Sequence, residues 1–209
     1  MGRYTGPVCR KCRRVGEKLF LKGDRCYTSR CAVDRRNSSP GMQTQKRRRI
    51  SDWGVHLREK QKARWTYGVF EQQFSNYFDL AKLDKGPSGD VLLQILEKRL
   101  DNVVFRLAFV DSRAQARQLV NHGYFTVNGK KVDIPSYLVK PNDVIAWVKK
   151  DKGTPEFVAN LTEGLPKRPV PEWLSLDVEN LEGKVLSDPI ISAEEMGIET
   201  RLIVEFYSK

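Results

Sequence analysis

All four cysteines of this chain lie within its first 31 residues, in the pattern C-x2-C-x13-C-x4-C. The segment that holds them, VCRKCRRVGEKLFLKGDRCYTSRC, is too short and too charged to bury an apolar core. Two cysteines two residues apart can chelate one ion, and residues 13–25 need only return the second pair to the same point. We therefore expect one metal ion, whose binding supplies the folding free energy of this segment, held by Cys9, Cys12, Cys26 and Cys31.

The expected metal is zinc in a structural role. No stretch approaches eighteen apolar residues and the N-terminus lacks a signal-peptide pattern, so we expect a soluble, cytosolic protein in which two disulfides are disfavoured. A site of four thiolates leaves no coordination position for water, which argues against a catalytic metal. An iron–sulfur cluster uses the same ligands and stays the alternative, although no flavin, nicotinamide or second-cluster signature accompanies the cysteines.

Positive charge is concentrated in the same part of the chain. Residues 1–67 carry 19 Lys and Arg against 5 Asp and Glu, whereas residues 68–209 carry 18 against 21. Residues 98–152 form a second basic region, with 11 against 5. This asymmetry favours a polyanionic partner, because each cation that neutralises a phosphate releases condensed counterions. Nucleic acid is favoured over an anionic membrane, since no basic helix has a broad face of Trp, Phe and Leu.

Three segments of the first basic region are expected to meet phosphates. The metal-held loop would fix its cations in place. Residues 34–50 lack apolar periodicity and end in four cations, which predicts either a disordered charge run or a basic arm that orders on RNA. Ser51 is the expected N-cap of a helix with a cationic face that ends at Gly68. From these segments we assign to RNA binding Arg3, Arg10, Lys11, Arg13, Arg14, Arg35, Arg36, Lys46, Arg47, Arg48, Arg49, Arg58 and Lys62.

Helical periodicity dominates the residues after Gly68. A stripe of Phe70, Phe74, Tyr77, Phe78 and Ala81 is expected to be core rather than a platform for base stacking. Beyond the loop at 85–90, VLLQILEKRLDNVVFRLAF predicts one long helix with a broad buried face.

Residues 98–150 predict a compact α+β module. Ser112 followed by Gln115 is a capping box, and Gly123 ends the short helix that it begins. Arg113 and Arg117 lie one turn apart on the polar face of this helix, a spacing that matches adjacent phosphates. A two-residue hairpin turn is predicted by Asn128-Gly129, with Lys130 and Lys131 just beyond it.

The remaining residues are less informative. Residues 151–171 predict a linker with a short helix, PEFVANLTEG. The acidic tail, residues 172–209, ends in RLIVEFYSK, which predicts a strand. A solvated surface is the ordinary interpretation of such a tail, and a protein contact is the alternative.

Several of these stretches together closely resemble one family, the bacterial small-subunit ribosomal protein S-four. They are MGRYTGPVCRKCRR, LREKQKARWTYG, the block from LEKRLDNVVFRLAF to DSRAQARQLVNHGYFTVNGKKVDIPSY, and LIVEFYSK. The similarity runs along essentially the whole chain. Residues 98–150 resemble the RNA-binding domain named after that family, which also occurs in pseudouridine synthases and tyrosyl-tRNA synthetases.

The resemblance implies a structural, ribosome-bound protein of the cytoplasm. Its expected partner is 16S rRNA, in the 5′ domain, where it would nucleate assembly of the body of the small subunit. Ribosomal proteins S-five and S-twelve, with which it would contribute to translational accuracy, and mRNA near the entry channel are further expected neighbours. No membrane and no small-molecule substrate is expected.

Residue by residue, the resemblance places the four cysteines on the ligands of zinc-bearing members. It also places an RNA-facing helix and turn on Arg113, Gln115, Arg117, Gln118, His122, Asn128, Lys130 and Lys131. Two departures from the family stand out. Ala114 replaces a second arginine after the helix cap, which removes one expected phosphate contact. Residues 37–45, NSSPGMQTQ, replace a Pro-Pro-Gly-Gln-His-Gly-like stretch.

The expected fold class is α+β: a mainly helical domain with an inserted small α/β RNA-binding domain and an extended, zinc-stapled N-terminal arm. By analogy with the family, the boundaries are an arm at 1–45, helical domain at 46–97, RNA-binding domain at 98–160, and a C-terminal segment at 161–209 that completes the helical domain.

Two other classes of function are disfavoured. A pseudouridine synthase needs a catalytic domain beyond the RNA-binding module, and the two histidines, His56 and His122, lack a nearby nucleophile or metal partner in the sequence. No phosphate-binding Gly-rich motif is present. A zinc-dependent DNA-binding regulator would need a recognition helix and usually a coiled-coil dimer interface with a heptad repeat, and no sustained heptad pattern occurs in the sequence. We therefore expect a binding protein, not an enzyme.

Overall fold

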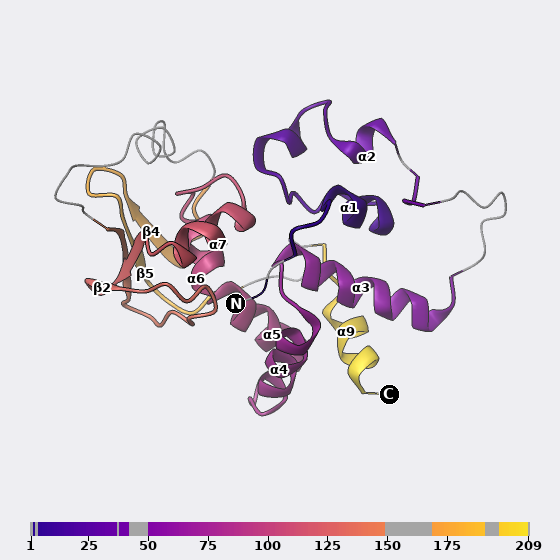
Figure 1. The fold of residues 1–209 in the computed structure, drawn as a ribbon. Coiled ribbons are helices and arrows are strands. Elements are labelled where there is room, and N and C mark those ends of the chain that lie inside the picture. Colours follow the sequence, from indigo (N-terminus) through magenta and orange to yellow (C-terminus); the bar gives the residue numbers. More distant parts are fainter. Residues whose placement is uncertain are drawn as a thin grey trace. The chain divides into compact units, whose positions relative to one another are not determined.

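The computed structural model describes residues 2, 4–36, 38–41, 50–148, 169–190 and 197–208. The chain divides into two compact units (Figure 1), the first built from residues 1–93 with 191–209 and the second from 94–190. No helix in the described ranges is long and apolar enough to cross a bilayer.

The cysteine-bearing part of the first unit forms short helical turns around a small apolar cluster. It contains helix α1 (Cys9–Val15), the 3₁₀ helix η1 (Gly23–Tyr27) and helix α2 (Ala32–Arg35). Helix α1 ends at Gly16, whose φ of 91° is a left-handed conformation that favours glycine. Residues Cys12, Val15 and Leu19 form the buried cluster, against which Leu21, Val33 and Trp65 pack.

Helices α3 (Asp52–Thr66), α4 (Glu71–Lys82) and α5 (Ser88–Glu97) continue the described chain. The predicted cap of α3 is confirmed, because Ser51 Oγ accepts a hydrogen bond from the Gly54 N–H at 3.3 Å. The predicted apolar stripe of α4 is also confirmed, with one exception. Phe70 precedes the helix and is 46% exposed, whereas the four later members of the stripe are buried.

The C-terminal strand predicted from RLIVEFYSK is wrong, because these residues form helix α9 (Thr200–Tyr207), which lies beside α3 in Figure 1. The β-branched residues favoured a strand, but helical spacing brings Ile203 and Tyr207 to one packed face, and tertiary packing overrides local propensity. Ile203 is fully buried, and the Tyr207 ring stacks on Phe78 with centroids 4.5 Å apart. The Tyr207 hydroxyl donates to Glu71 Oε1 at 3.0 Å.

The single long helix predicted before the second unit is also wrong, since α5 ends at Glu97 and a separate helix, α6 (Leu100–Arg106), begins at Leu100. The chain leaves the helix at residues 98–99 to pair with residues 137–139. Leu100 N–H donates to the Tyr137 carbonyl at 2.8 Å, and Val139 N–H donates to the Lys98 carbonyl at 2.9 Å. These long-range bonds replace helical ones, so the local sequence did not reveal the break.

The second unit packs α6 and α7 (Arg113–Asn121) with an antiparallel sheet of order β2-β1-β3-β5-β4. The strands are β1 (Phe125–Val127), β2 (Lys130–Lys131), β3 (Val144–Trp147), β4 (Leu174–Asp177) and β5 (Glu182–Val185). The predicted hairpin is confirmed, and its two turn residues have φ values of 50° and 76°, as a type I′ turn requires. The α+β fold class is confirmed by this mixed unit beside the helical elements.

The C-terminal segment divides differently from the expected boundary at residue 161. Strands β4 and β5 join the sheet of the second unit, where Ala146 of β3 pairs with Glu182 of β5. They do so because β3 offers an open edge and because Leu174 and Val185 bury against the core of that unit. Of the described residues after 161, only 197–208 belong to the first unit. The helix predicted from PEFVANLTEG lies outside the described residues.

Candidate nucleic-acid interface

The four cysteines come together in the first unit. Cys9 and Cys12 lie on α1, Cys26 on η1, and Cys31 directly before α2, and all four line one small cavity of about 10 Å³. Burial raises the pKa of the Cys12 and Cys26 thiols, and repulsion from the other cysteines raises both further. Within the described ranges, however, no group of three or more His, Cys, Asp or Glu side chains is arranged as a metal centre. The donor set and its enclosure fit a thiophilic ion, and the ligand assignment stays a prediction.

The predicted RNA-binding cations of α1 differ in their surroundings. Arg10 and Arg14 are exposed. Arg13 is half-buried, and its Nε donates to the Ser38 carbonyl at 2.9 Å, which ties α1 to the chain that follows α2. Lys11 Nζ lies 3.9 Å from the centroid of the Tyr4 ring. Burial lowers the pKa of Lys11, and the nearby positive charge of Arg64 lowers it further.

The expected cationic face of α3 is wrong for most of its members. Lys62 is buried and forms an ion pair with Glu17, with Nζ and Oε2 2.5 Å apart. Lys60 is also buried, and its Nζ donates to Glu71 Oε1 at 2.6 Å, while Arg64 approaches the same carboxylate at 3.0 Å. Of the four Lys and Arg residues of α3, Arg58 alone is exposed. Helix α3 therefore uses its other cations to hold the first unit together.

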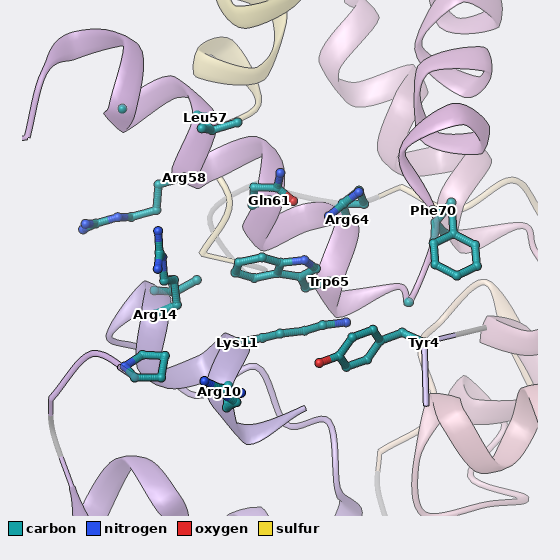
Figure 2. A pocket seen from close by; sticks show the side chains of 15 residues that line it. Tyr4, Arg10, Lys11, Arg14, Leu57, Arg58, Gln61, Arg64, Trp65 and Phe70 are labelled. Carbon is teal, nitrogen blue, oxygen red and sulfur yellow. The ribbon is translucent and has the colours of Figure 1, made fainter. Parts of the chain in front are cut away.

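A pocket of about 690 Å³ lies between α1 and α3. Figure 2 shows Arg14 and Arg58 at one end, the Trp65 indole in the middle, and Lys11 extending beside it toward Tyr4. The sequence did not predict this pocket, because neither Trp65 nor Tyr4 was assigned to a site. Cationic segments with an aromatic residue close in sequence were the available signal. The residues that line the pocket are Tyr4, Arg10, Lys11, Arg14, Val15, Pro40, Gly54, Leu57, Arg58, Gln61, Arg64, Trp65, Gly68, Val69 and Phe70.

The two arginines of α7 do not project freely from the second unit as expected. Arg117 is 5% exposed, and its NH1 lies 3.4 Å from Asp101 Oδ2. Arg113 Nε donates to Asn102 Oδ1 at 2.7 Å, and its guanidinium lies over the Phe105 ring at 4.4 Å from the centroid. Both side chains thus contact α6. The expected pair of outward guanidiniums is wrong for Arg117 and is only partly met by Arg113.

The other candidates of the second unit fall into two groups. Gln115 completes the predicted cap, accepting from the Asp111 N–H at 3.1 Å while its own N–H donates to Ser112 Oγ at 3.3 Å. Asn128 is a turn residue whose amide donates to Asp143 Oδ1 at 2.8 Å and accepts from the Val144 N–H at 2.9 Å. Asn128 is exposed as well, and the other exposed candidates are Gln118, His122, Lys130 and Lys131.

Two further predicted surfaces remain to be placed. Arg35 and Arg36 are exposed at the end of α2. Arg3 and the four arm cations, Lys46, Arg47, Arg48 and Arg49, lie outside the described residues. The exposed candidates of the described chain are therefore found mainly on α1, α2 and α3 of the first unit and around the hairpin of the second.

Comparisons with known proteins cover the whole chain. Residues 3–97 match the family model described as ribosomal protein S4/S9 N-terminal domain, and residues 98–145 match that of the S4 domain. The small ribosomal subunit protein uS4 of Acetivibrio thermocellus is 54% identical, over 209 residues that span 100% of both chains. Over the same full span, uS4A of Alkaliphilus oremlandii is 55% identical and uS4 of Caldicellulosiruptor saccharolyticus is 53% identical.

Proposed function

This chain belongs to the uS4 family of small ribosomal subunit proteins, and from that membership we infer that it is a structural component of the small subunit that binds rRNA. The observation that carries the inference is identity above half along the full length, including residues 98–145 of the S4 domain. The protein is structural rather than enzymatic, and it works ribosome-bound in the cytoplasm.

The exposed cations support this function physically. Arg10, Arg14 and Arg58 of the first unit and Lys130 of the second are exposed on folded elements. Side chains held in this way neutralise phosphates at fixed positions, and such contacts give affinity that depends steeply on salt. Recognition of RNA by shape and by its backbone suits this surface, because the deep major groove of A-form RNA hides the base edges.

Sedimentation and salt titration test the function. The purified full-length protein should bind a transcript of the 5′ domain of 16S rRNA, with log K falling linearly against log salt, and should cosediment with small subunits at low salt. A protein that binds this transcript no better than an unrelated RNA of equal length, or that stays in the supernatant at low salt, would contradict the proposal.

The finer role that the family resemblance implies extends the proposal. We place the chain on the 5′ domain of 16S rRNA, early in assembly of the subunit body, with ribosomal proteins S-five and S-twelve as partners in accuracy and mRNA near the entry channel as a neighbour. Ordered addition of proteins to rRNA in vitro tests the early step. Later proteins of the body should bind poorly when this chain is left out, and equal binding without it would refute the role.

We also propose that Cys9, Cys12, Cys26 and Cys31 hold one structural zinc ion. Their shared cavity supports this, because it brings four thiols to one point, and a bound cation would favour the thiolate form and stabilise a segment with little apolar core. Elemental analysis of the full-length protein should find one zinc per chain, and Cys26→Ser should lose it. Iron with visible absorbance would indicate a cluster instead, and protein that folds identically without any metal would refute the site.

A further inference from the structure

The pocket between α1 and α3 carries a chemistry that general attraction to phosphate does not explain. Its lining combines cations with the aromatic residues Tyr4, Trp65 and Phe70, and none of the described residues that line it is Asp or Glu. Its volume, about 690 Å³, lies within the range of pockets that hold small organic ligands. A duplex backbone runs over a surface and would leave such a hollow empty.

Three cations at the pocket have no acidic partner among the described residues. In the described part of the chain no carboxylate pairs with Arg10, Arg14 or Arg58, whereas Arg64, deeper in the lining, is paired with Glu71. Because a concave site with charge of one sign concentrates the electric field, an anion is drawn to it more strongly than to the same charges on a flat surface. Figure 2 shows Arg14 and Arg58 together at one end, where two guanidiniums from different helices can bind one phosphate.

Two buried polar atoms of the lining side chains have no partner. Gln61 Oε1, an acceptor, and Arg64 Nε, a donor, are both buried, and neither forms a hydrogen bond within the described ranges. Both atoms are closed to solvent in this structure, so a ligand with a donor and an acceptor on one edge would meet them only if the two side chains turn toward the pocket. Nucleobases have such edges, and their flat faces stack on indole and phenol rings.

We propose that this pocket receives one unpaired nucleotide of the rRNA, with its base against Trp65 and its phosphate between Arg14 and Arg58. The inference rests on the proposed function and deepens it, because it gives the chain a contact that distinguishes a single-stranded position from a duplex. An acidic peptide would satisfy the arginines but would leave Trp65 without a flat partner. The nucleotide uses the cations and the ring together.

Photo-crosslinking of the full-length protein bound to the 16S 5′-domain transcript tests the proposal. Mass spectrometry should find a nucleotide adduct on the peptide that carries Trp65 or Tyr4, and mapping of the RNA should place it at one unpaired position. Removing the base at that position should weaken binding about 5- to 150-fold, the range expected for one stacked base, with the salt dependence unchanged.

Protein variants complete the test. Trp65→Leu should weaken binding by a similar factor. Combined with the abasic RNA, it should cause little further loss of affinity, because the two changes remove the same stacking interaction. The double variant Arg14→Gln, Arg58→Gln should abolish the adduct. It should also lower the salt slope, the magnitude of the slope of log K against log salt, by about 2, whereas the exposed control Lys85→Gln should change neither the adduct nor the slope. Since Trp65 also packs against the buried cluster of Cys12, Val15 and Leu19, circular dichroism checks folding, and the arginine variants decide the matter if Trp65→Leu unfolds.

The outcomes separate the two proposals. Wild-type protein that does not bind the transcript refutes the proposed function itself. Protein that binds but gives no adduct on pocket residues, or an adduct with a base-paired nucleotide, overturns the pocket inference and leaves the function standing. Additive effects of Trp65→Leu and the abasic RNA would also overturn it.

Discussion

The arginines of α7 and those of α1 and α3 look alike in the sequence and have different surroundings in the structure. Arg113 and Arg117 lie four apart on one helix, as do Arg10 and Arg14. Arg117 is buried against Asp101, whereas Arg10 and Arg14 remain exposed. The difference comes from neighbouring elements, since α6 brings Asp101 and Asn102 to α7, whereas the described residues that line the pocket beside α1 include no Asp or Glu.

This comparison shows that the role of a Lys or Arg side chain depends on which Asp and Glu side chains the fold places next to it. Lys62 and Arg58 repeat the contrast within a single helix, with Lys62 paired to Glu17 and Arg58 exposed. Buried cations stabilise a unit only while their partners remain, and exposed ones are available to phosphate. Substitutions at the two kinds of site should therefore change different measurements.

The largest effect should come from breaking the internal network of the second unit. Asp101 accepts from Arg99 at 2.7 and 3.0 Å, and Arg99 is fully buried. Asp101→Ala would remove the carboxylate that pairs with this buried guanidinium, so we expect the free energy of unfolding to fall by about 3–5 kcal/mol. Urea unfolding followed by tryptophan fluorescence, to which Trp147 and Trp173 of the core of the second unit contribute, measures it. The free energy of unfolding of the exposed control Asp84→Ala should lie within about 0.5 kcal/mol of that of wild type. An Asp101→Ala variant as stable as wild type would contradict the contrast between buried, paired cations and exposed ones.

The next effect concerns the arm cations that lie outside the described residues. Replacing Lys46, Arg47, Arg48 and Arg49 by glutamine should lower the magnitude of the salt slope of rRNA binding by about 3–4, because each phosphate contact contributes about 0.9. Between about 50 and about 200 mM salt this corresponds to roughly a hundredfold smaller loss of affinity. Filter binding at several salt concentrations measures the slope, and an unchanged slope refutes the arm's assignment to RNA.

Lys62 and Arg58 sharpen the comparison on one helix. Lys62→Gln should lower the stability of the first unit by about 1–3 kcal/mol, because Glu17 and the half-buried Glu59 lose a charged partner, and should leave the salt slope unchanged. Arg58→Gln should lower the salt slope by about 0.9, and its free energy of unfolding should stay within about 0.5 kcal/mol of that of wild type. Thermal unfolding and salt titration of both variants give the readouts. If Lys62→Gln lowers the slope instead, its ion pair opens on RNA.

The smallest effect is expected at the hairpin of the second unit. Lys130 is exposed on β2, so Lys130→Gln should lower the salt slope by about 0.9 without changing stability. Comparison with Lys85→Gln, an exposed lysine of the first unit, controls for general charge. Equal slopes in the two variants would mean that the hairpin does not touch phosphate.

Local signals in the sequence predicted local structure well. Ser51 and Ser112 cap their helices as predicted, because a cap depends on residues only three apart. The Asn128-Gly129 turn is likewise set by its own two residues. The helix break at residues 98–99 and the helix at Thr200–Tyr207 were missed, since both depend on partners far along the chain.

The candidate site was predictable in kind and less so in detail. Clustering of the cysteines and cations in the first third of the chain follows from counting alone. Which cations are exposed does not, because Glu17 and Asp101 meet Lys62 and Arg117 only through packing of separate elements. The pocket was hidden for the same reason, as its walls come from α1 and α3, which are some forty residues apart.

The discontinuity of the first unit has a consequence for biogenesis. During translation residues 94–190 emerge as one continuous stretch and can form their sheet before the chain is complete. Helices α3 and α4 can pack fully only after α9 has been synthesised. Until then His56 lacks Glu205, Glu71 lacks the Tyr207 hydroxyl, and the surface that buries Ile203 is open to water. In a nascent chain paused before residue 197, the second unit can therefore be folded while the first unit still exposes apolar surface. Such a chain would be a substrate for chaperones or for premature capture by RNA.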